Sequence, residues 1–112
     1  MHEVGLCEGV LEAVRKRAAG RPVRRVRIRA GIRHAVDPQS MAQAFDLVAR
    51  GTEAAGAAVD VVTVPAELTC RACGGTAETA DLLAVCDRCG SADVALRGGD
   101  ELVLESIEYA PQ

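Results

Sequence analysis

The sequence contains almost no aromatic residues: Phe45 and Tyr109 are the only two, and tryptophan is absent. A hydrophobic core must therefore be built from aliphatic side chains, which are plentiful because 49% of the residues are hydrophobic. That content disfavours intrinsic disorder. The scarcity of rings that could stack on bases also disfavours a nucleic-acid-binding role.

Long apolar runs are also missing. The longest extend over only a few residues, far fewer than the ~20 that a membrane-spanning helix needs. The N-terminal Met-His-Glu does not resemble a signal peptide, which would begin with a basic segment followed by an apolar one. We therefore expect a cytoplasmic protein without a membrane partner. Its 112 residues suffice for one domain that carries a small metal-stabilised insert.

Charge is distributed unevenly, although the net charge is only -3. Residues 1–50 carry ten Lys/Arg against five Asp/Glu, whereas residues 51–112 carry three against eleven. Nine of the thirteen basic residues lie between Arg15 and Arg33. This basic cluster is either a solvated helix end and strand face or a docking surface for an acidic partner. An alternative function is therefore a zinc-ribbon nucleic-acid-binding module that uses the Arg15–Arg33 cluster.

Four of the five cysteines form two CxxC pairs that are twelve residues apart: Cys70, Cys73, Cys86 and Cys89. Each tight turn can direct two sulfurs at one ion, and four thiolates complete the closed tetrahedral shell that zinc prefers. Gly74 and Gly90 follow the pairs, where they can adopt the positive φ of a knuckle turn. Two disulfides would require an oxidising compartment, and a redox site would require one CxxC opening a helix. We therefore predict a structural zinc.

Hydrophobic periodicity predicts two helices. An i, i+3/i+4 stripe that includes Cys7 predicts a helix over residues 4–19, with Cys7 as a small core residue and not a ligand. Asp37-Pro38 is typical of a helix start, with Asp37 as N-cap. A second buried stripe follows, and Gly51 is expected to end that helix.

Alternation of apolar residues and arginines predicts a strand over residues 23–33 with one buried and one cationic face. Further strands are expected at 58–64 and 101–109, the last with a bulge or with both faces buried. The cysteine module, 66–97, lies between these two strands, and their antiparallel pairing would bring its ends together. The predicted fold is α+β, with two helices packed on a three-stranded sheet and an inserted zinc-ribbon-like module. The corresponding domains are 1–65 plus 98–112 and 66–97.

The N-terminal Met-His-Glu offers a second metal site. The terminal amine and the His2 amide close a five-membered chelate ring, and the His2 imidazole closes a six-membered ring with the same amide. Glu3 could add a further donor. Nickel(II) and copper(II) both accept such nitrogen-rich ligand sets. The alternative is an ordinary exposed terminal histidine, and His34 is most simply a surface residue.

Several motifs together resemble one known family. They are Met1-His2-Glu3, Asp37-Pro38, Ala44-Phe45, the Val64-Pro65-Ala66 lead into CxxC-x12-CxxC, and Gly99-Asp100-Glu101-Leu102. Along essentially its full length, the chain resembles the hydrogenase maturation nickel metallochaperones of the HypA/HybF family. The cysteine spacing alone would fit many zinc ribbons. The terminal motif and the inserted position of the ribbon make the resemblance specific.

The resemblance implies a metal carrier, not an enzyme, that delivers Ni(II) to the large subunit of [NiFe] hydrogenase and in some bacteria to urease. The implied partners are a hydrogenase maturation GTPase, that large subunit and, for urease, its maturation proteins. His2 is then the nickel ligand, assisted by Met1 and Glu3, while the four cysteines hold a structural Zn(II). Some relatives place an acidic nickel ligand at the position of Asp37, where the N-cap role is a sufficient explanation. Whether His34 adds a donor, and whether the protein is a monomer or a homodimer, stays open.

Overall fold

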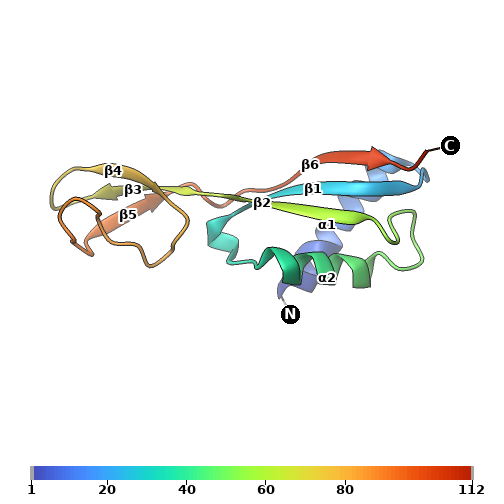
Figure 1. Ribbon diagram of the computed structural model, residues 1–112, viewed down its shortest axis with the longest axis horizontal. Helices are drawn as coiled ribbons and strands as arrows, with labels where there is room; N and C mark the ends of the chain where they lie inside the picture. Colours follow the sequence, from blue (N-terminus) through green and yellow to red (C-terminus); the bar gives the residue numbers. More distant parts are fainter. Residues whose placement is uncertain (1, 112) are drawn as a thin grey trace.

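The computed structural model describes residues 2–111 and measures 56 Å along its longest axis and 17 Å along its shortest. Two three-stranded sheets lie at opposite ends of this length, and both helices pack at one end (Figure 1). The elements are α1 (His2–Ala18), β1 (Val23–Gly31), the 3-10 helix η1 (Ile32–His34), α2 (Pro38–Val48), β2 (Ala58–Val64), β3 (Ala66–Cys70), β4 (Thr76–Thr79), β5 (Val94–Arg97) and β6 (Leu102–Tyr109). No helix within residues 2–111 is long and apolar enough to cross a membrane.

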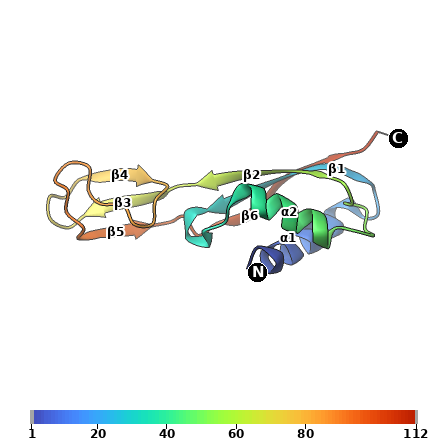
Figure 2. The same cartoon turned by 60° about the horizontal axis from the view of Figure 1, so that its bottom comes forward.

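The larger sheet has the strand order β2-β1-β6, with β1 parallel to β2 and antiparallel to β6. Helix α2 connects the two parallel strands, as a crossover connection requires. Both helices cover the same face of this sheet (Figures 1 and 2). The expected α+β architecture of two helices on a three-stranded sheet is therefore confirmed.

The helices form because their apolar residues recur on one face. In α1 the buried residues are Cys7, Val10, Val14 and Ala18, which follow the predicted stripe with Val10 added to it. The Asp37 side chain caps α2 by accepting a hydrogen bond from the Ser40 amide at 2.9 Å. Met41 and Phe45 of α2 are fully buried, so the aliphatic core encloses the one phenylalanine. The helix itself ends at Val48, three residues before the expected stop at Gly51.

The expected pairing of the strands that flank the cysteine module is wrong. Strands β2 and β6 do not pair with each other, because β1 lies between them. The observed order is compatible with the charges, because arginines on the helix-free face of β1 meet Asp60 of β2 on one side and Glu105 of β6 on the other. The ends of the module still approach each other, since both strands lie beside β1.

Two strand details also differ from or refine the prediction. Strand β1 ends at Gly31, two residues before the predicted end, and the chain then turns through η1. Ile32 is nevertheless buried, as the predicted alternation of buried and exposed residues requires. In β6 the pairing with β1 shifts between Arg27 and Ile28, which confirms the expected bulge. The extra residue of the bulge is Glu105, which turns toward the arginines of β1.

The segment after Pro65 forms the second sheet, with the strand order β4-β3-β5 and antiparallel pairing throughout. Pro65 separates β2 from β3, so the chain passes from one sheet to the other as a nearly continuous strand (Figure 1). The return path, Gly98–Glu101, is attached to η1. Arg33 donates from Nε to the Gly98 carbonyl at 2.7 Å and from Nη2 to the Leu96 carbonyl at 2.6 Å.

Candidate metal centres

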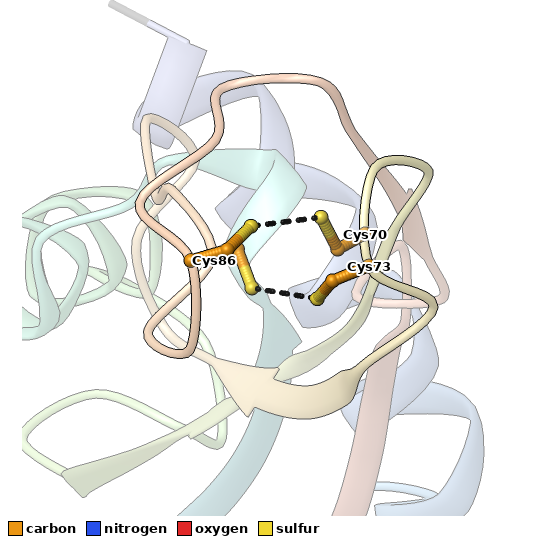
Figure 3. Close-up of side chains that lie close together, drawn as sticks. Cys70, Cys73 and Cys86 are labelled. Atoms are coloured by element: carbon orange, nitrogen blue, oxygen red, sulfur yellow. Dashed lines mark hydrogen bonds between the residues drawn. The ribbon is translucent and has the colours of Figure 1, made fainter.

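Two matching turns present the cysteines of the second sheet. At the end of β3 the amide of Gly74 donates to the Cys70 carbonyl at 2.9 Å, and in the facing loop the amide of Gly90 donates to the Cys86 carbonyl at 2.8 Å. Gly74 has a φ of 76° and Gly90 a φ of 74°, the left-handed conformation that glycine adopts without strain. The predicted knuckle turns are therefore present. Figure 3 shows Cys86 facing Cys70 and Cys73 from the opposite loop.

The four sulfurs form one compact cluster. Cys70 Sγ lies 3.7 Å from Cys89 Sγ, Cys73 Sγ lies 3.6 Å from Cys86 Sγ, and all four sulfurs lie within 4.8 Å of one another. No disulfide joins the cysteines of residues 2–111. Zinc–thiolate bonds of about 2.3 Å place the sulfurs of a tetrahedral site about 3.8 Å apart. The donor set and its spacing therefore fit a zinc ion.

Backbone amides favour the charged form of two of these thiols. Hydrogen bonds from the backbone of Cys89 and Arg88 lower the pKa of Cys86 to about 7 despite burial. The backbone of Cys73, followed by that of Ala72, lowers the pKa of Cys70 in the same way. A thiolate is the form that binds metal, so the turns prepare these two sulfurs as ligands.

Cys89 differs from this pair. A backbone hydrogen bond from Ser91 lowers its pKa, but the contact with Cys70, burial and the other nearby thiols outweigh that effect and raise the pKa to about 11. Crowded thiols oppose the ionisation of one another when no cation lies among them. A divalent ion at the centre of the cluster would remove this opposition.

The fifth cysteine, Cys7, lies in the hydrophobic core and not in the cysteine cluster. Cys7 is fully buried in α1 and donates from Sγ to the Met41 carbonyl at 3.3 Å. Burial, with a smaller effect of the Glu3 charge, raises the pKa of its thiol to about 11. The predicted core role of Cys7 is therefore confirmed.

The second candidate centre lies at the start of α1. The His2 side chain is 53% exposed, and its Nδ1 lies 3.4 Å from Oε1 of Glu3. On the other side of the ring, Nε2 donates to the His34 carbonyl at 2.8 Å. Met1, the third predicted participant, lies outside the described residues. The structure therefore brings His2 and Glu3 together and adds the backbone of His34, which no sequence pattern had indicated.

Asp37 and His34, the two further residues that the sequence left open as nickel ligands, do not join His2 and Glu3 through their side chains. Asp37 accepts from both the amide and the hydroxyl of Ser40, which accounts for its carboxylate as an N-cap. The His34 ring donates from Nε2 to the Asp100 carbonyl at 2.9 Å. Within residues 2–111, the four cysteines are the one cluster of three or more metal-ligating side chains.

Ion pairs account for much of the basic cluster. On the helix-free face of the larger sheet, Arg27 contacts Glu105 at 2.6 Å, and neighbouring pairs extend this pattern across the sheet. These further pairs are Arg24–Glu108, Arg25–Asp60, Arg25–Glu108, Arg29–Glu101 and Arg29–Glu105. The cationic strand face is thus confirmed, and it is neutralised within the chain. Nothing in this arrangement favours the nucleic-acid alternative.

Three comparisons with known proteins find the same kind of protein. The family model described as "Hydrogenase/urease nickel incorporation, metallochaperone, hypA" matches residues 1–109. The hydrogenase maturation factors HypA of Acidithiobacillus ferrooxidans and Rhodobacter capsulatus are 33% and 35% identical to this chain, each over 96% of this chain and 98% of its own length. The solution structure of the Ni metallochaperone HypA from Helicobacter pylori matches with a TM-score of 0.58 and 25% identity, and 98% of both chains is covered.

Proposed function

Because the chain belongs to the HypA family of hydrogenase and urease nickel-incorporation metallochaperones, we propose that it binds Ni(II) at the start of α1 for delivery to a maturing enzyme. Proteins of this family are metal carriers and not enzymes. The nickel-binding domain comprises 1–65 and 98–112, and 66–97 forms a zinc-binding module inserted into it.

The nickel assignment rests on the contact between the exposed His2 side chain and the half-buried Glu3 side chain. The Nδ1 atom of His2 and the Oε1 atom of Glu3 are 3.4 Å apart, close enough for one ion to contact both. The first amides of a helix have no carbonyl partner within the helix, so the amides of His2 and Glu3 are free of that bond. In the proposed ligand set the His2 imidazole is the principal donor, and the Met1 amine and Glu3 assist. A site at an exposed helix end can take up and release its cargo without disturbing the core.

The four cysteines hold the second metal, Zn(II), which stays in place. Four thiolates form a closed shell with no open position for a substrate, so the ion stabilises the module and performs no chemistry. The module needs this contribution because it has a small core of its own. Its buried side chains are Ala66, Leu68 and the two ligands Cys70 and Cys86. A structural zinc contributes on the order of 10 kcal/mol to folding.

Membership of the family supports the proposed partners. The chain passes nickel to the large subunit of a [NiFe] hydrogenase together with a maturation GTPase, and urease maturation proteins are the alternative recipients. Four free thiols at zinc-binding spacing require a reducing compartment, which supports a cytoplasmic location.

Nickel titration of the zinc-loaded protein tests the assignment. His2→Ala should lose high-affinity nickel binding while its zinc content and helical circular dichroism stay unchanged. The exposed position of His2 favours folding of the variant, which the circular dichroism spectrum checks. Equal nickel affinity in the variant and the wild type would contradict the proposed function.

A further inference from the structure

The hydrogen bond between His2 and the backbone of His34 determines which nitrogen of the His2 ring is available. A carbonyl oxygen only accepts, so the 2.8 Å contact requires that His2 Nε2 carries the hydrogen. In the neutral ring Nδ1 then has a free lone pair. That lone pair lies on the side of the ring that faces Glu3.

We propose that His34 is a positioning residue for the nickel ligand His2. Its backbone carbonyl holds the Nε2–H tautomer and fixes the plane of the ring, so that Nδ1 points toward the cargo ion. This inference rests on the proposed nickel function.

Chelation requires Nδ1. A ring that contains the metal, the His2 amide nitrogen, Cα, Cβ, Cγ and Nδ1 has six members, whereas closure through Nε2 would need a larger ring with unfavourable geometry. Histidines that bind metals commonly donate their other N–H to a carbonyl or carboxylate, which sets the tautomer and the ring orientation. The His34 carbonyl occupies this supporting position in the structure.

The side chain of His34 fixes the position of its own carbonyl. Its Nε2 donates to the Asp100 carbonyl at 2.9 Å, just before β6 begins. One residue earlier, the Arg33 amide donates to the Gly99 carbonyl at 2.8 Å. One residue later, Ala35 adopts a left-handed φ of 51° and donates its amide to the Ile32 carbonyl. Such a backbone is held only where surrounding contacts determine it, and the His34–Asp100 bond is one of them.

The His34–Asp100 hydrogen bond also offers a way to distinguish a positioning role of His34 from a role as a nickel ligand. His34 engages Asp100 through a ring N–H, a role that a glutamine side chain can take over because its amide also donates. Glutamine cannot replace an imidazole as a nickel ligand of similar strength. His34→Gln should therefore keep a positioning role and abolish a ligating one.

The test compares full-length, zinc-loaded wild type with His34→Ala, His34→Gln and His2→Ala. Loss of a supporting contact to a metal-bound histidine typically lowers affinity by about 10- to 100-fold. For His34→Ala we expect a loss of nickel affinity of about tenfold, at the lower end of that range. His34→Gln should bind nickel with nearly wild-type affinity, and His2→Ala should show no high-affinity binding. The number of imidazoles in the nickel X-ray absorption spectrum should be the same in wild type and His34→Gln.

A second readout needs no nickel. Long-range 1H–15N correlation spectra of the metal-free protein report the His2 tautomer directly, at a pH where the ring is neutral. Wild type and His34→Gln should show the Nε2–H form, and His34→Ala a mixture of tautomers. Unchanged affinity and unchanged tautomer in His34→Ala would overturn the inference, as would weak binding with one imidazole fewer in His34→Gln. Nickel binding retained by His2→Ala would instead refute the proposed function, while the tautomer spectra still report on the His34 contact.

Discussion

The carbonyl oxygen of Gly99 occupies the space that a side chain on Gly31 would need. A Cβ atom on Gly31 would lie 2.1 Å from this oxygen and 2.2 Å from the carbonyl carbon. Both groups are backbone, and both are tied in place, because the Gly31 amide donates to Glu101 and the Gly99 carbonyl accepts from Arg33. The end of β1 thus packs closely against the backbone of the segment Gly98–Glu101, which returns from the cysteine module.

Gly31→Ala should therefore destabilise the protein. Overpacking of this kind typically costs about 1–3 kcal/mol, because the backbone must shift to remove the clash. Urea denaturation measures the loss. Gly9→Ala is the matched control: its position in α1 is exposed, nothing lies within 4 Å of the added methyl group, and helix propensity predicts a gain of about 0.5–1 kcal/mol. Equal stability of Gly31→Ala and the wild type would show that the contact is looser than described.

The N-cap of α2 makes a separate prediction. Asp37→Ala removes the acceptor of the Ser40 amide and should cost about 1 kcal/mol in the free energy of unfolding. Asp37→Ser keeps a capping oxygen but removes the carboxylate, so its stability should stay near wild type. Nickel titration of this second variant also settles the ligand question: a weakened affinity with intact stability would identify the Asp37 carboxylate as a nickel ligand.

The ion pair between Arg27 and Glu105 should contribute little despite its 2.6 Å contact. The two side chains are 51% and 35% exposed, and such pairs contribute at most about 1 kcal/mol. A double-mutant cycle with Arg27→Met and Glu105→Gln measures the coupling, which should decrease as salt is added. A coupling well above that limit, or one insensitive to salt, would contradict this prediction.

The strand order β2-β1-β6 was available in the sequence but was not inferred from it. Residues 23–33 carry arginines and no acidic residue, and residues 101–109 carry three glutamates and no basic residue, so charge complementarity favours the pairing of β1 with β6. The prediction instead paired the two strands that flank the module, because closing an insertion is simplest between direct neighbours. The helices and the zinc knuckles were predicted well, since periodicity and CxxC spacing are local signals. The His2–His34 contact could not be predicted, because a backbone carbonyl has no signature in the sequence.

Removal of one zinc ligand should have a local effect. Cys86→Ser should lose zinc and the ordered structure of the second sheet, while α1 and α2 keep their helical circular dichroism, because the core that packs them contains none of the four ligands. Cys7→Ala is the matched control, since it also removes a buried thiol but should keep its full zinc content. Zinc loss in Cys7→Ala, or its retention in Cys86→Ser, would contradict the proposed ligand set.

Zinc retention should also depend on pH in a defined direction. Backbone hydrogen bonds from Cys89 and Arg88 lower the pKa of Cys86 from its ordinary value of 9.0 to about 7, so the fold favours the thiolate. For a lowered pKa, the stabilisation is fully present above the ordinary value and is lost as the pH falls through the folded one. Protons should then compete with the metal, and zinc transfer to a fixed concentration of chelator should increase as the pH falls from 8, most steeply below about 7, where Cys86 is protonated as well as Cys89. Transfer measured from pH 8 to pH 5, corrected for the protonation of the chelator, checks this. A corrected transfer that does not change with pH would show that the thiolates are not the groups that hold the ion.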